Sequence, residues 1–247
     1  MADQFSRTRL LVGDEPLARL AAAKVAVFGV GGVGGFCVEA LARAGVGTLH
    51  LYDDDTVSES NLNRQIVALH STIGQPKAEV MARRGLDINP ACQVEVFRMF
   101  YLPENADQVD LSQYDYVVDC IDTVAAKLDL VERCTTLQVP ILSAMGSGNK
   151  LDPTAFRVTD LSKTQGCPLA RVMRKELRKR GITHLKVVYS TEEPLTPLQP
   201  AEEEASAGTD TRPRSTARRA TPGSISFVPA AAGLVAASAV IRDLGGF

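Results

Sequence analysis

A glycine-rich turn at residues 29–35, with the sequence GVGGVGG, constrains the fold of this chain more than any other feature. An apolar run at residues 24–28 precedes it, and a helical pattern at residues 36–44 follows it. The G-x-G-x-x-G spacing lets phosphate approach the backbone N–H groups at the positive end of a helix. We therefore predict a nucleotide site here, and a tight turn without a ligand is the alternative. The glycines expected to line the site are Gly29, Gly31, Gly32 and Gly34.

Apolar runs continue to alternate with helical patterns beyond this turn. Such alternation predicts parallel strands with right-handed crossovers, and hence a doubly wound, mostly parallel, Rossmann-like α/β sheet. The 247 residues fit a single domain, with a nucleotide-binding core at residues 24–145 and a C-terminal extension of added strands and helices. Residues 192–222, rich in Pro, Glu, Ala, Thr and Arg, are predicted to form a mobile loop. Strands are expected at residues 24–28, 48–52, 93–97, 116–118, 141–143, 156–159 and 184–189, and helices at residues 36–44, 77–88, 127–137 and 169–180, with an Ala-rich last helix ending near residue 244.

Composition narrows the class of protein. A hydrophobic content of 45% and a charged content of 23% are typical of a soluble globular protein. The net charge of −2 excludes overall electrostatic capture of nucleic acid, although local patches remain open. Five cysteines without a C-x-x-C pair predict neither a zinc site nor a disulfide framework, and they suit a reducing compartment. With no signal peptide visible, and residues 228–241 shorter than the roughly 18 to 20 apolar residues of a membrane span, we expect a cytoplasmic protein without a membrane segment.

An acidic cluster follows the second expected strand. Asp53 lies about 20 residues beyond the glycine turn, where an acidic side chain can accept hydrogen bonds from ribose hydroxyls. Asp54 and Asp55 are its neighbours, and one of the three is expected to cap the following turn. This pattern provides for an adenine nucleotide but does not distinguish ATP from a nicotinamide dinucleotide.

The next stretch favours a triphosphate. SNLNRQ at residues 60–65 and GQPK at residues 74–77 place Arg64 and Lys77 near the glycine turn, where they can meet the charge that develops when a triphosphate is cleaved. Asp122 is expected to lie at the end of the fourth strand, to face the same crevice at the carboxyl edge and to hold Mg²⁺. A surface cation, a first-turn lysine and a helix cap are the ordinary alternatives for these three residues, and their joint placement favours function.

Together these motifs resemble the ubiquitin-activating-enzyme superfamily, which includes the bacterial MoeB and ThiF adenylyltransferases. The resemblance rests on GVGGVG, DDDTV, NLNRQ, GQPK and VDCID, and it implies ATP and Mg²⁺ as cofactors. It also implies a homodimer, because Arg7 in FSRTRLLVG resembles the arginine that family members lend to the partner subunit's ATP. The catalytic residues that it implies are Arg7, Arg64, Lys77 and Asp122, the last also at the metal, and the nucleotide-binding side chains are Asp53, Asp55, Asn61, Arg64, Lys77 and Asp122.

Three segments resemble one branch of that superfamily, the tRNA threonylcarbamoyladenosine dehydratases. They are MGSGNKLDP at residues 145–153, VTDLSK at residues 158–163 and CPLARVMRKELRKRG at residues 167–181. The branch implies that a threonyl carboxylate on tRNA is adenylated and then cyclised with release of AMP, and it leaves a cysteine-desulfurase or sulfur-acceptor partner open. The alternatives are activation of a ubiquitin-like sulfur carrier, against which the missing paired cysteines argue, and a nicotinamide oxidoreductase. Arg64, Lys77 and the lack of an obvious hydride-relay histidine argue against the oxidoreductase.

A basic patch is the expected substrate surface. Residues 171–186 carry seven basic residues against one acidic residue, in a chain whose net charge is −2. On a helix most of these cations share one face, which suits an RNA phosphate backbone, although a solvated helix face is the ordinary alternative. The residues expected to contact tRNA are Arg171, Arg174, Lys175, Arg178 and Lys179.

Cys167 precedes this helix and is a candidate nucleophile, because a helix N-terminus and nearby cations can lower the pKa of a thiol. An intramolecular cyclisation needs no thioester intermediate. We therefore favour a structural or accessory role for Cys167.

Overall fold

The structure is a computed structural model that describes residues 3–198 and 222–247. Its centre is a seven-stranded sheet with the order β3-β2-β1-β4-β5-β7-β6. All neighbouring strands are parallel except β6, which runs antiparallel to β7 at one edge. This confirms the doubly wound, mostly parallel sheet. The strands are β1 (Lys24–Phe28), β2 (Thr48–Tyr52), β3 (Gln93–Phe97), β4 (Tyr116–Asp119), β5 (Ile141–Ala144), β6 (Phe156–Asp160) and β7 (Lys186–Ser190).

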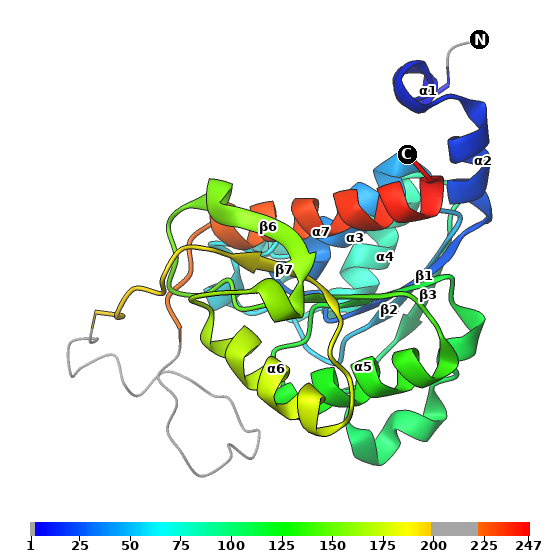
Figure 1. The fold of residues 1–247 in the computed structure, drawn as a ribbon. Coiled ribbons are helices and arrows are strands. Elements are labelled where there is room, and N and C mark those ends of the chain that lie inside the picture. Colours follow the sequence, from blue (N-terminus) through cyan, green and yellow to red (C-terminus); the bar gives the residue numbers. More distant parts are fainter. Residues whose placement is uncertain (1–2, 199–221) are drawn as a thin grey trace.

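Helices cover both faces of the sheet. Figure 1 shows α3, α4 and α7 on one face, α5 and α6 on the other, and α1 extending beyond the sheet at the N-terminus. Buried aliphatic side chains fill both layers, as two-sided cover of parallel strands requires. The helices are α1 (Ser6–Val12), α2 (Asp14–Ala22), α3 (Gly34–Ala44), α4 (Lys77–Ile88), α5 (Val124–Leu137), α6 (Pro168–Lys179) and α7 (Phe227–Gly245).

The last helix is longer than the apolar segment at residues 228–241. By length and composition, the 19 residues of α7 would be enough to cross a membrane. In this fold α7 packs lengthwise against α3, and Val228, Ala232 and Val240 lie in the main core cluster. Gly233 makes this packing possible, because a Cβ atom there would lie 2.3 Å from the Val33 carbonyl oxygen.

Most element boundaries agree with the sequence-based expectations to within a few residues. The sequence analysis missed α1 and α2, which precede the sheet, and it placed the start of α5 three residues too late. Residues 192–198 and Pro222 have no helix or strand in the structure, and residues 199–221 of the predicted loop lie outside the described residues. That loop, and the division of the chain into one domain with a core at residues 24–145, stay predictions.

Gly233→Ala should destabilise the protein by about 1–3 kcal/mol, because the new methyl group has no room between α7 and α3. Chemical denaturation monitored by circular dichroism measures the change. Ser238→Ala is the matched control, because Ser238 lies on the exposed side of the same helix. Equal stability of the two variants would show that α3 and α7 do not need this close approach.

Candidate active site

The glycine turn lies at the carboxyl edge of the sheet, between β1 and α3. Gly29 adopts a φ of +87°, a left-handed conformation that favours glycine. A Cβ atom at Gly29 would lie 2.8 Å from the Cys120 carbonyl oxygen, so the turn touches the chain just beyond β4. Since Gly34 begins α3, the backbone N–H groups at the positive end of this helix border the turn.

Asp53 directly follows β2 and holds the glycine turn. Its Oδ2 accepts a hydrogen bond from the Val30 backbone N–H at 2.6 Å, and its Oδ1 accepts one from the Asp55 N–H at 2.9 Å. Burial raises the pKa of this carboxyl, and the two backbone donors partly oppose that shift. The carboxylate therefore lies where strand β2 and the turn meet, as a ribose-binding role requires.

Two cations border the same turn. Lys77 begins α4, is 6% exposed, and its Nζ lies 2.9 Å from Asp55 Oδ2. Arg64 is half-buried; its Nη1 donates to the Ser60 carbonyl oxygen at 2.9 Å and to Asn63 Oδ1 at 2.8 Å. A Cβ atom at Gly32 would lie 3.7 Å from Arg64 Cγ, so this side chain passes close to the glycines. Burial lowers the pKa of Arg64, yet arginine remains charged at neutral pH.

Asn61 supports the segment that carries Arg64. Its Oδ1 accepts the Ser58 backbone N–H at 3.1 Å, and the residue is 7% exposed. The Arg64 N–H in turn bonds the Asn61 carbonyl oxygen at 3.1 Å. The amide oxygen of Asn61 therefore stabilises this turn.

Asp122 lies just beyond the carboxyl end of β4. Strand β4 ends at Asp119, so Asp122 belongs to the connection to α5 and its side chain is exposed. The sequence placed it at the carboxyl edge where the fourth strand ends, and its role there stays a prediction. A single exposed carboxylate fits Mg²⁺, which keeps several waters and binds substrate phosphates. Among the described residues no group of three metal-ligating side chains is found.

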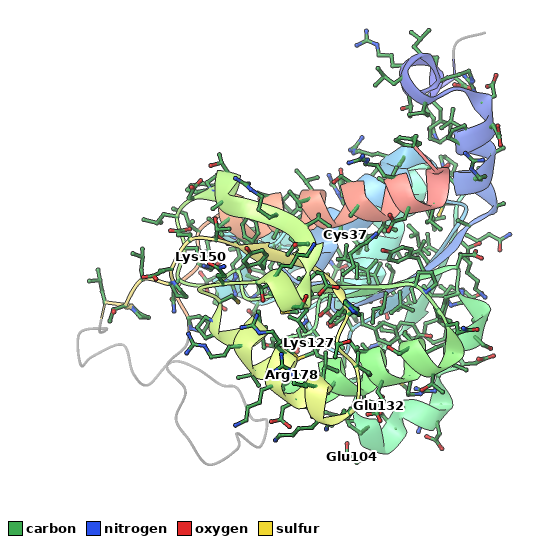
Figure 2. The ribbon with its side chains drawn as sticks, viewed as in Figure 1. Cys37, Glu104, Lys127, Glu132, Lys150 and Arg178 are labelled. Carbon is green, nitrogen blue, oxygen red and sulfur yellow. The ribbon has the colours of Figure 1, made fainter. Side chains whose placement is uncertain are left out.

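A buried ammonium beside this edge was missed by the sequence analysis. Lys127, labelled in Figure 2, is 0% exposed. Its Nζ lies 3.0 Å from Asp119 Oδ2, at the end of β4. Position 127 was expected to begin a helix but was given no role. The sequence did contain a signal for this pair. Asp119 is an acidic residue at the end of an apolar strand, and Lys127 lies among apolar residues in the helix that follows.

Cys167 caps α6. It is 4% exposed, and its Sγ accepts the Ala170 backbone N–H at 3.5 Å. A buried sulfur that satisfies a helix N-terminus is in keeping with the structural role favoured from the sequence.

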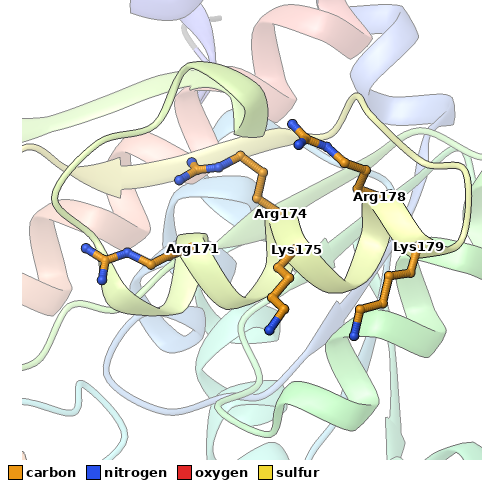
Figure 3. A pocket seen from close by; sticks show the side chains of 5 residues that line it. All are labelled: Arg171, Arg174, Lys175, Arg178 and Lys179. Carbon is orange, nitrogen blue, oxygen red and sulfur yellow. The ribbon is translucent and has the colours of Figure 1, made fainter.

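The basic helix exposes four of its five predicted contacts. Arg171, Lys175, Arg178 and Lys179 have exposed side chains, and Figure 3 shows them with Arg174 around a shallow surface pocket. Arg174 differs from the others because its Nη1 bonds the carbonyl oxygens of Leu161 (3.2 Å) and Thr164 (2.8 Å), and the Thr164 hydroxyl. These bonds connect α6 to the short helix η6 (Leu161–Lys163) and to Thr164 directly after it, so the Arg174 guanidinium stabilises the packing of α6.

Arg7 lies at the other edge of the sheet. It belongs to α1. Gln4, just before this helix, donates a hydrogen bond of 3.2 Å from its Nε2 to Oδ1 of Asn89, which lies between α4 and the start of β3. Helix α2 then leads into the start of β1. Because the glycine turn lies where β1 ends, Arg7 and the turn of one chain are not brought together.

Known proteins are similar to this chain in sequence and in fold. The ThiF family matches residues 5–247. A tRNA threonylcarbamoyladenosine dehydratase of Bacillus subtilis (strain 168) is 44% identical over 99% of this chain and 95% of its own length. The enzyme of that description from Escherichia coli (strain K12) is 37% identical over 98% and 93%. The crystal structure of the E. coli enzyme TcdA in complex with ATP has a TM-score of 0.85 and 35% identity, covering 98% of this chain and 94% of that one.

Arg174→Ala should lower the free energy of unfolding by about 1–3 kcal/mol, because it removes charged hydrogen bonds to Leu161 and Thr164. Lys175→Ala, one position along the same helix and exposed, should change it by less than about 0.5 kcal/mol. Denaturant titration of both variants measures the difference. If Lys175→Ala were the more destabilising variant, the structural assignment of Arg174 would be wrong.

Proposed function

This chain belongs to the ThiF family, and we propose that it is an ATP-dependent tRNA threonylcarbamoyladenosine dehydratase. The proposal rests on the convergence of Asp53, Lys77 and Arg64 on one glycine turn, in a fold that matches TcdA over nearly its whole length. The TcdA structures include complexes with ATP and with AMP, as expected for an enzyme that adenylates its substrate.

The fold supplies the groups that adenylation needs. The α3 N-terminus and the glycine turn hold the phosphates, and Asp53 receives the ribose hydroxyls. When the threonyl carboxylate attacks the α-phosphorus and pyrophosphate leaves, Arg64 and Lys77 stabilise the charge on the transferring group. Asp122 is the carboxylate that would hold Mg²⁺, which neutralises phosphate charge.

Cyclisation then needs little further catalysis. The carbamoyl group of the same nucleoside attacks the acyl-adenylate carbonyl, gives up a proton and displaces AMP. Because nucleophile and electrophile are tethered, their effective concentration is high and no strong external nucleophile is required. The buried, helix-capping position of Cys167 agrees with a route that has no thioester.

The basic helix is the proposed tRNA surface. Exposed Arg171, Lys175, Arg178 and Lys179 present positive charge on an otherwise slightly acidic protein. Helix α6 begins near the strand end where the reaction is placed, because a Cβ atom at Gly146, just after β5, would lie 3.9 Å from Leu169. RNA phosphates along α6 would therefore lead toward the nucleotide site.

A homodimer is proposed from two surfaces. Leu10 and Leu11 on α1 are 86% and 87% exposed, and Phe227 and Leu234 on the outer side of α7 are 43% and 49% exposed. Such apolar positions suit burial against a second copy. A second copy would also place Arg7 at a partner's ATP, which one chain alone does not do.

Two further attributes complete the proposal. The five cysteines are all free thiols, which suits the reducing cytoplasm. A cysteine-desulfurase or sulfur-acceptor partner stays a prediction from the sequence resemblance.

The first test is pyrophosphate release from ATP and Mg²⁺ with three samples: tRNA that carries threonylcarbamoyladenosine, unmodified tRNA, and no tRNA. Release should require the modified tRNA, and mass spectrometry should show that the nucleoside has lost one water. Asp122→Asn and Arg64→Ala should abolish turnover while circular dichroism shows an intact fold. Activity with a glycine-ended carrier protein, without any dependence on tRNA, would instead assign the chain to the sulfur-carrier activators.

Arg7→Ala should abolish turnover in the homodimer but be complemented in trans. A heterodimer of Arg7→Ala and Asp122→Asn chains, isolated with two affinity tags, contains one site with an intact Asp122 and an Arg7 from the other chain. It should recover about half of the wild-type rate, since one of two symmetric sites is complete. A heterodimer as inactive as its parents would place Arg7 in its own chain's site.

A further inference from the structure

Lys127 is a cation in an unfavourable place. It lies in the first turn of α5, where the helix dipole disfavours positive charge, and its side chain is 0% exposed. Burial of an ammonium group is costly unless charge and hydrogen bonds compensate it. Replacing a whole buried ion pair by uncharged groups of similar volume is often neutral or stabilising, so stability alone gives little reason for this lysine and its carboxylate partner.

All three protons of this ammonium group are used, and they join two strands. The Nζ lies 3.0 Å from Asp119 Oδ2 at the end of β4, 3.2 Å from Ser143 Oγ on β5, and 2.7 Å from the Ala144 carbonyl oxygen at the end of β5. The Ser143 hydroxyl also donates to Asp119. The network therefore lies entirely at the carboxyl edge of the sheet.

On the β4 side, the hydrogen bonds of the network continue to the proposed nucleotide site. Asp119 uses its other oxygen, Oδ1, to accept the Ile121 backbone N–H at 3.1 Å. The Cys120 N–H bonds the Phe28 carbonyl oxygen at 2.8 Å, directly before Gly29. Asp122 is the next residue after Ile121, so the orientation of this carboxylate depends on how Asp119 is held.

On the β5 side, the chain continues from the network to helix α6, the proposed tRNA surface. Beyond Ala144, the Met145 N–H bonds the Val188 carbonyl oxygen of β7 at 2.8 Å. The next residue, Gly146, lies against Leu169 in the first turn of basic helix α6. The Ala144 carbonyl that Lys127 holds therefore lies two residues before the point where the chain meets α6.

We propose that Lys127 is a positioning residue that sets the Asp122 connection, at residues 120–123, relative to the segment at residues 145–148. It is fully buried and touches no reactant; it acts through Asp119 and the Ala144 carbonyl. This inference rests on the proposed dehydratase function for its kinetic consequence, whereas its structural consequence is independent of the substrate.

The test separates positioning from stability by removing the charged pair in two steps. Lys127→Met leaves Asp119 buried without its cation and should lower the melting temperature. Lys127→Met with Asp119→Asn removes both charges, keeps an amide that can bond Ser143 and Ile121, and should recover most of that loss. If Lys127 positions the site, the double variant should still have a kcat at least about tenfold below wild type, with the KM for ATP little changed.

Hydrogen exchange supplies a readout that does not depend on the reaction. In the double variant, amide exchange should rise at residues 120–123 and 145–148 and stay at the wild-type rate in β1 and β2. Tyr101→Phe is the control for a lost hydrogen bond to the same helix, because the Tyr101 hydroxyl, which comes from the connection after β3, bonds Asp129 and Arg133 of α5. This control should lose stability without a change in kcat or in exchange at the two segments.

The outcomes are distinguishable. Recovery of kcat together with the melting temperature, and unchanged exchange at both segments, would overturn the positioning role. Lack of turnover by the wild-type protein on modified tRNA would reject the proposed function, and the exchange comparison would still decide the role of Lys127. Lys127→Arg, which keeps the charge and multiple donors, should retain more activity than Lys127→Met.

Discussion

The parallel pairing of β1 with β4 determines where this protein can do chemistry. It brings Gly29 so close to the backbone at Cys120 that no side chain fits between them. Strands β2 and β3 lie to one side of β1, and β4 and β5 lie to the other, so the order in which strands are added to the sheet reverses at this contact. A crevice at the carboxyl edge follows from that reversal. The glycine turn, Asp53 and the connection that carries Asp122 all border it because they leave adjacent strands in the same direction.

The two cations at this edge differ in their partners. Buried Lys77 forms an ion pair with half-buried Asp55, whereas Arg64 makes hydrogen bonds to neutral groups of Ser60 and Asn63. A lysine already paired with a carboxylate keeps a fixed position and needs little reorganisation when phosphate charge arrives. Arg64 has no carboxylate partner among the hydrogen bonds and ion pairs of the described residues, so its charge is available to an anionic ligand.

The sequence was informative wherever function requires a particular residue at a particular spacing. The glycine turn, the acidic residue after β2 and the cations at positions 64 and 77 could be placed because backbone geometry and phosphate charge leave few alternatives. The exact end of β4 could not be read from the sequence, because the chain there packs against Gly29, and that contact is not local in sequence. Arg174 could not be separated from its neighbours, since helical spacing does not show that η6 approaches one side of α6.

Lys127 shows the limit of pattern reading most clearly. In the sequence it is an ordinary lysine in a helix, and its burial arises only when β5 is added beside β4. The same event brings Ser143 and the Ala144 carbonyl to the ammonium group. A cation that forms its bonds only in the assembled sheet favours this strand arrangement, because burial without Ser143 and the Ala144 carbonyl would leave two of its three protons without partners. The same hydrogen bonds of Lys127 therefore hold β4 beside β5 and orient the residues that follow the two strands.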